Sequence, residues 1–149
     1  MANYYDVDKT DRPTYVSFPE PGYNSVNDYL VSSLPWVTSS TATSGSIKKH
    51  EFEKVSSYLM IMNNGTIGQF LRVGFTERGV NGSTGFHLRL NGASSVFLNV
   101  RVKEFYIRSD GAYSPDYSVM AGLTMIPAKN APVLTASVLN KDGYWNGVG

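Results

Sequence analysis

The sequence contains no cysteine. Disulfide bonds, thiolate nucleophiles and sulfur-ligated metal sites are therefore excluded, and packing alone has to stabilise the fold. Only two histidines are present, His50 and His87, and no apolar run approaches the roughly 20 residues of a membrane-spanning helix. Residues 1–6 lack both a basic stretch and an apolar one. We therefore expect the chain to be made and kept in the cytoplasm unless a larger particle carries it out.

Neither sign of charge predominates. Lys and Arg total 13 against 12 Asp and Glu, which gives a net charge of +1. A chain this balanced has no overall field that would attract nucleic acid or an anionic membrane surface. We therefore expect neither nucleic acid nor membrane among its partners, and we look to other proteins or to neutral ligands.

The first 45 residues show no sustained hydrophobic period. Four prolines interrupt them, and residues 39–45 form a small polar linker. The one helix that this segment suggests covers residues 27–34 and is ended by Pro35. The segment is nevertheless rich in aromatic side chains, which need something to cover them. We therefore predict an extended, aromatic-rich N-terminal arm over residues 1–45.

From Ser46 onward the sequence changes to short runs of β-branched and aromatic residues. Pairs such as Asn81-Gly82 and Asp110-Gly111 lie where the runs stop, as is typical of hairpins and tight loops. Seven strands are predicted, over residues 46–52, 55–62, 69–76, 85–90, 95–108, 117–126 and 133–139. The predicted fold is all-β: a single jelly-roll-like antiparallel β-sandwich over residues 46–139, with the extended arm before it and a C-terminal tail over residues 140–149.

The longest predicted strand, residues 95–108, changes its alternation partway. One phase holds Val96, Leu98, Val100 and Val102, and the opposite phase holds Phe105 and Ile107. The pattern predicts a bulge or a change of sheet near residues 103–104, because either one would bury both sets.

Neither histidine belongs to a recognisable catalytic or metal-binding motif. The alternation around His50 predicts a solvated or edge position. His87, between Phe86 and Leu88 on a short strand, is predicted to face outward.

Six carboxylates of the β-domain are candidates for the facing pair of a glycosidase: Glu51, Glu53, Glu77, Glu104, Asp110 and Asp116. Nothing in the sequence pairs them, and scattered acids in a small β-domain are mostly surface charges. The Gly-rich residues 79–85 lack the Lys-Ser/Thr of a phosphate loop and predict a flexible exposed loop. We therefore predict that the protein is not an enzyme and binds no cofactor and no metal.

Charged and aromatic side chains suggest two kinds of surface. A shared outward phase of Arg72, Arg89, Arg101 and Lys103 predicts either a solvated face or a basic stripe that meets an acidic protein. Stacking on sugar rings and anchoring of a protein interface are both open to Tyr113, Tyr117, Tyr144 and Trp145. The predicted partner-binding residues are Tyr4, Tyr5, Tyr15, Phe18, Tyr23, Trp36, Tyr144 and Trp145.

Five segments occur in a familiar order: residues 63–65, 71–76, 79–82, 100–107 and 121–126. In texture and order they resemble the small jelly-roll capsid accessory proteins of double-stranded DNA viruses, especially the cement or decoration proteins of tailed phages. The resemblance covers about half of the chain, from Asn63 to Ile126, and includes no diagnostic motif.

The resemblance implies a structural virion protein that binds and stabilises the major capsid shell through arm and sheet contacts. Its partners would be the major capsid protein and other copies of itself in a homotrimer. It would be located in the capsid after assembly in the host cytoplasm, and the family has no catalytic residues to carry over.

Two other functions remain open from the sequence. A carbohydrate-binding or receptor-binding β-sandwich module of a viral fibre predicts exposed aromatics clustered on one loop face. A small hydrolase predicts a cleft with two facing carboxylates.

Overall fold

The computed structural model describes residues 34–82 and 85–132. Within these ranges the chain forms eight β-strands, one short α-helix and one 3₁₀ turn. The strands are β1 (Leu34–Thr41), β2 (Ile47–Glu51), β3 (Lys54–Asn63), β4 (Phe70–Gly74), β5 (Leu88–Leu90), β6 (Ser94–Leu98), β7 (Glu104–Asp110) and β8 (Asp116–Pro127). The helix is α2 (Glu77–Asn81), and the 3₁₀ turn is η1 (Ala128–Asn130). No helix in the described part is long and apolar enough to cross a membrane.

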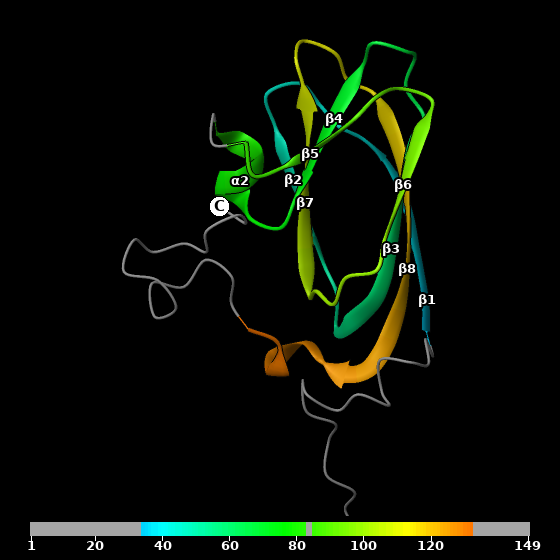
Figure 1. Ribbon diagram of the computed structural model, residues 1–149, viewed down its shortest axis with the longest axis vertical. Coiled ribbons are helices and arrows are strands. Elements are labelled where there is room, and N and C mark those ends of the chain that lie inside the picture. The colour runs from blue at the N-terminus through cyan, green and yellow to red at the C-terminus, as the bar shows by residue number, and fades with distance from the viewer. Residues whose placement is uncertain (1–33, 83–84, 133–149) are drawn as a thin grey trace, which may run out of the picture.

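The strands form two antiparallel sheets that face each other (Figure 1). The first sheet has the order β1-β8-β3-β6 and the second has the order β2-β7-β4-β5. Strand β1 pairs with β8, β2 with β7, β3 with β6, and β4 with β5. The first four strands therefore pair with the last four in reverse order, from β1 with β8 to β4 with β5. These pairs are distributed alternately between the two sheets. This nested pairing is the jelly roll, and it confirms the predicted jelly-roll-like antiparallel sandwich.

The core lies between the sheets and is built from one phase of each strand. Leu59 and Ile61 of β3 are fully buried, as are Leu71 of β4 and Ile107 of β7. Burying each such side chain contributes about 1.5–3 kcal/mol to folding. Period-two alternation is therefore the main reason that these segments form strands with one face inward.

The expected change of sheet near residues 103–104 is confirmed. Strand β6 lies in the first sheet and β7 in the second, and residues 99–103 connect them. Val96 and Val102 pack against the core from before the change, and Phe105 and Ile107 are buried after it. The switch of phase in the sequence thus marks the point where the chain crosses from one layer to the other.

The sandwich begins earlier than the sequence predicted. Residues 34–41, which were assigned to the arm, form β1, and Trp36 is paired with Ala121 of β8. The polar end of β1 is tolerated because β1 is an edge strand, where Thr41 Oγ1 donates to Asp116 Oδ1 at 2.5 Å. The rest of the predicted arm, the body of the helix predicted at 27–34, the strand predicted at 133–139 and the tail at 140–149 lie outside the described residues.

The start of the Gly-rich stretch is a helix and not the exposed loop that was predicted. The Thr76 side chain caps α2 by accepting from Gly79 N at 3.0 Å, and Val80 is fully buried. A Cβ on Gly74 would lie 2.7 Å from Val80 Cγ1, so glycine is required there for α2 to pack on β4. The Thr-Glu pair at 76–77 is a helix-start signal that could have revealed α2.

Candidate functional site

The outward side of the first sheet carries one carboxylate, Asp116, at the end of β8, and the uncharged surface beside it we call the neutral face. Its members are Pro35, Val37, Ser39, Tyr58, Met60, Met62, Ser95, Phe97, Ser118 and Met120. The strand register places Val37 beside Met120, Met120 beside Met60, and Met60 beside Phe97. These four side chains therefore form one apolar row across all four strands of the sheet.

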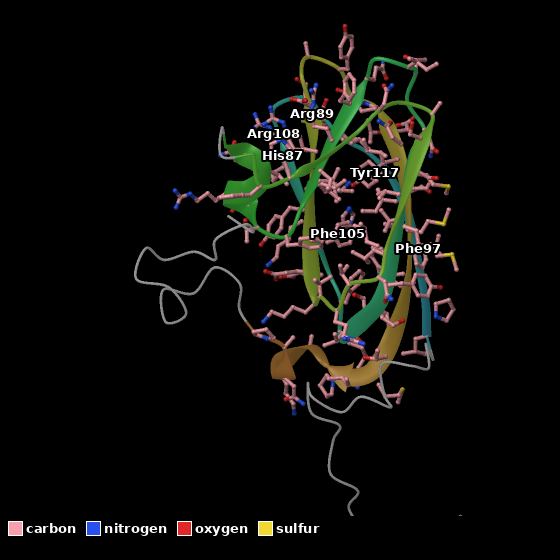
Figure 2. All side chains as sticks on the ribbon, viewed as in Figure 1. His87, Arg89, Phe97, Phe105, Arg108 and Tyr117 are labelled. Carbon is pink, nitrogen blue, oxygen red and sulfur yellow. The ribbon has the colours of Figure 1, made fainter. Side chains whose placement is uncertain are left out.

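The row is open to solvent at both ends. Val37 is 67% exposed and Phe97 is 63% exposed, and Phe97 stacks on Tyr58 with ring centroids 5.4 Å apart. Figure 2 shows Phe97 and several sulfur atoms projecting from this side of the sandwich. Contiguous exposed apolar surface of this kind marks interaction sites, and methionine side chains adapt well to a partner's shape.

The sequence of β3 carries a signal for this surface that the sequence analysis did not use. Residues 58–62 read Tyr-Leu-Met-Ile-Met, so both phases of the strand are apolar. Leu59 and Ile61 fill the core, whereas Tyr58, Met60 and Met62 face outward. A strand that is apolar on both faces is typical of sheets that are covered on both sides. The outer cover of this sheet is not among the described residues.

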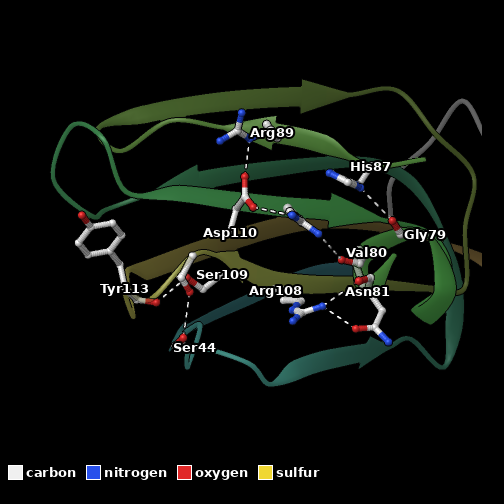
Figure 3. A network of polar contacts seen from close by, with 12 residues as sticks. Ser44, Gly79, Val80, Asn81, His87, Arg89, Arg108, Ser109, Asp110 and Tyr113 are labelled. Carbon is white, nitrogen blue, oxygen red and sulfur yellow. Dashed lines mark hydrogen bonds and ion pairs between the residues drawn. The ribbon is translucent and has the colours of Figure 1, made fainter. Parts of the chain in front are cut away.

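The outer side of the second sheet is charged. Arg72, Arg89 and Arg108 are neighbours in the strand register, and Asp110 lies between the first two (Figure 3). Arg72 Nε donates to Asp110 Oδ1 at 2.9 Å, and Arg89 Nε lies 2.5 Å from Asp110 Oδ2. Burial alone would raise the pKa of Asp110, but the two guanidinium groups outweigh burial and lower it. The carboxylate therefore stays ionised and holds the arginines in place.

The predicted basic stripe exists only in part. Arg72 and Arg89 are adjacent as expected, but Arg101 and Lys103 lie on the crossover between the sheets. Lys103 Nζ donates there to the Ala131 carbonyl at 3.4 Å. Arg108, which the sequence analysis did not single out, completes the row and donates to the Asn81 carbonyl of α2 at 2.9 Å. Most of these basic side chains thus bind other groups of the same chain.

His50 lies on an edge strand, β2, which is one of the two predicted alternatives, but its side chain is buried and not solvated. It is 8% exposed, stacks on Phe105 at 4.9 Å, and its Nε2 forms a hydrogen bond of 2.8 Å with the Tyr117 hydroxyl. Burial, with a smaller effect of Lys48, lowers its pKa to about 4. His50 shares its phase with Phe52, and this pattern could have placed it in the core.

His87 lies on the outer side of the second sheet, beside α2. It precedes β5, is half-buried, and its Nδ1 lies 2.9 Å from the Gly79 carbonyl. Because a carbonyl only accepts, Nδ1 carries the proton in this contact. His87 thus has the predicted outward direction, and its ring holds α2 through this hydrogen bond.

Of the eight predicted partner-binding aromatics, Trp36 alone lies in the described residues. Its ring meets Phe52 edge-on at 4.9 Å and Phe105 at 6.5 Å, so it belongs to the core of its own domain. Tyr117 is fully buried and cannot stack on a sugar, whereas Tyr113 is exposed. The other seven, Tyr4, Tyr5, Tyr15, Phe18, Tyr23, Tyr144 and Trp145, lie outside the described residues.

Two of the candidate carboxylates, Glu51 and Glu104, are partners in the register of β2 and β7. Glu51 and Glu104 both bind Lys49, whose Nζ lies 2.9 Å from Glu104 Oε2, and these hydrogen bonds raise the pKa of Lys49. They border a groove of about 410 Å³ that Glu53, Lys103 and Lys129 also line. Across residues 34–82 and 85–132, no three His, Asp or Glu side chains gather as metal ligands.

No protein-family model matches the chain, and no curated protein matches it in sequence. The candidate site that the geometry selects is the neutral face, a continuous exposed apolar surface across the first sheet.

Proposed function

We propose that this protein is a structural protein of a virus particle: a capsid cement or decoration protein that binds and stabilises the major capsid shell. Two observations support the proposal besides the resemblance described above. The fold is an eight-stranded jelly roll, an architecture used by viral capsid proteins. One of its two sheets also presents an uncharged apolar face to solvent.

The neutral face is the single observation that carries the proposal. Its central row, Val37, Met120, Met60 and Phe97, presents hydrocarbon and sulfur. A sugar site would instead need several hydrogen-bonding groups to hold hydroxyls, and a nucleic-acid site would need cations for phosphate. A protein surface of matching shape fits this row best, because burying it against protein removes apolar area from water.

The first experiment is mass spectrometry of particles purified from the source of the sequence. We expect the chain in a fixed ratio to the major shell protein. Its absence from every particle fraction would contradict the proposal.

A binding experiment then tests the face itself. We expect Phe97→Lys to reduce co-sedimentation with shells at least tenfold, because the lysine would have to be desolvated in the contact. The matched control is Ile67→Lys, which adds the same charge at a loop residue that is 81% exposed and lies off the neutral face. Equal binding by both variants would show that another surface holds the shell.

A further inference from the structure

The chain enters the sandwich at the border of the neutral face. Strand β1 is an edge strand of the first sheet, and its first residue, Leu34, is 45% exposed. Pro35 and Val37, the next outward residues of β1, already belong to the neutral face. The polypeptide that precedes Leu34 in the sequence, residues 1–33, is therefore tethered directly beside the surface that lacks a cover.

Part of that polypeptide matches the neutral face in chemistry. Residues 13–27 contain a single charged side chain, Glu20, among the aromatics Tyr15, Phe18 and Tyr23. Three prolines in the same stretch, at positions 13, 19 and 21, keep it from forming a helix and favour an extended chain. Such a segment can lie across an uncharged sheet face while leaving almost no charge desolvated.

The geometry at Leu34 favours delivery to a second copy. Steric clash with the ring of a following proline keeps a residue extended, so Leu34 continues the line of β1, and β8 runs on beside that line from Leu123 to Pro127. To cover its own face, the chain would have to reverse within residues 28–33, which span at most about 20 Å. The whole of residues 1–33 reaches up to about 110 Å when extended, enough to cross to a neighbour.

We propose that the segment Pro13–Asn27 of one copy lies on the neutral face of a neighbouring copy, with its aromatic side chains packed on the row from Val37 to Phe97. This inference rests on the proposed function and narrows it: the neutral face would join copies of this chain to one another, so Phe97→Lys would weaken shell binding by breaking up the assembly that binds the shell. A contact between a segment and a face is heterologous, so its repetition closes into a ring when the rotation allows.

Disulfide trapping in the full-length protein tests the proposal without any particle. Because the chain has no cysteine, introduced cysteines are the only ones that can react. One sample mixes chains carrying Ser17→Cys with chains carrying Ser95→Cys, which lies on the neutral face opposite Met62. The control mixes the Ser17→Cys chain with Glu51→Cys, an exposed position on the second sheet. After oxidation, we expect at least tenfold more mixed dimer in the first sample.

Three outcomes would overturn the proposal. The first is equal trapping with Ser95→Cys and Glu51→Cys. The second is a Ser95→Cys chain that dimerises with itself as efficiently, since the neutral faces would then meet each other. The third concerns a chain that carries both Ser17→Cys and Ser95→Cys. If it forms an intramolecular crosslink and the singly substituted chains form no mixed dimers, each segment covers its own face. None of these results depends on shell binding, so failure here is distinguishable from failure of the proposed function.

Discussion

His50 shows how one buried side chain links packing to pH. It lies among Trp36, Phe105 and Tyr117, and its pKa falls to about 4 from the ordinary 6.5. The unfolded chain therefore binds a proton at higher pH than the folded chain does. Its contribution to stability is complete above pH 6.5 and is progressively lost as the pH falls from 6.5 toward 4.

We expect the melting temperature of the wild type to fall between pH 7 and pH 4.5, and His50→Gln to flatten that fall. The glutamine amide can still reach the Tyr117 hydroxyl, so we expect the substitution to cost about 1–3 kcal/mol at pH 7. Thermal melts followed by circular dichroism measure both effects. The carboxylate of Asp110 has a lowered pKa and therefore titrates below this window. An unchanged pH slope in His50→Gln would assign the effect to other groups.

At the scale of elements, α2 depends on its cap and on close packing. Thr76 accepts from Gly79 N, and α2 in turn holds Arg108 and His87 through its carbonyls. The helix thus packs on the outer side of the charged second sheet, and within residues 34–82 and 85–132 no helix packs on the outer side of the first sheet.

Removing the side-chain cap should weaken the first turn of α2. We expect Thr76→Ala to destabilise the protein by about 1–2 kcal/mol, because the first turn of α2 loses its side-chain acceptor. Chemical denaturation measures the change, and Thr76→Ser is the control, since it retains the hydroxyl. If Thr76→Ser and Thr76→Ala were equally destabilised, the loss would come from packing of the methyl group and not from the cap.

Because β1 is part of the sandwich, we expect two N-terminal truncations to differ, although the sequence alone places both within the arm. We expect removal of residues 1–33 to leave a cooperative melt, whereas removal of residues 1–44 should abolish it. The longer deletion removes a strand of the first sheet together with Trp36, a partly buried side chain that packs on Phe52 and Phe105 of the core. Far-UV circular dichroism and thermal melts distinguish the two outcomes. A stable fold after the longer deletion would mean that β1 is dispensable to the core.

At the scale of the whole molecule, the outer faces of the two sheets differ in charge. The second sheet ties its charges to one another and to α2, while the first leaves an apolar row exposed. Contiguous exposed apolar surface is typical of interaction sites, and the proposed assembly role would bury it.

We expect the isolated wild-type protein to be an oligomer, with a trimer as the main species in native mass spectrometry. Phe97→Lys should shift the population to monomer, because the lysine would lie unpaired in the buried contact. Ile67→Lys should leave it unchanged. A monomeric wild type at micromolar concentration would contradict the proposed contact between copies.

The sequence by itself determined the all-β class, most of the strands and the crossing point near residues 103–104. These features follow from alternation and turn residues, which are local properties of the chain. Val96 and Phe105, for example, reveal the change of sheet because they lie in opposite phases of the alternation. This difference can be seen without knowing which strands pair. The apolar run of β3, residues 58–62, likewise held the signal of an apolar outer face on the first sheet.

Only the tertiary structure decided which residues meet. The polar residues of β1 indicate a linker in the sequence, but in the structure they pair with β8. His50 resembles a surface residue in the sequence, but in the structure it contacts Phe105 and Tyr117. The apolar row spans four strands far apart in the sequence, and only strand pairing brings them into register. Pairing of distant strands depends on the packing of the whole chain, and no local pattern records it.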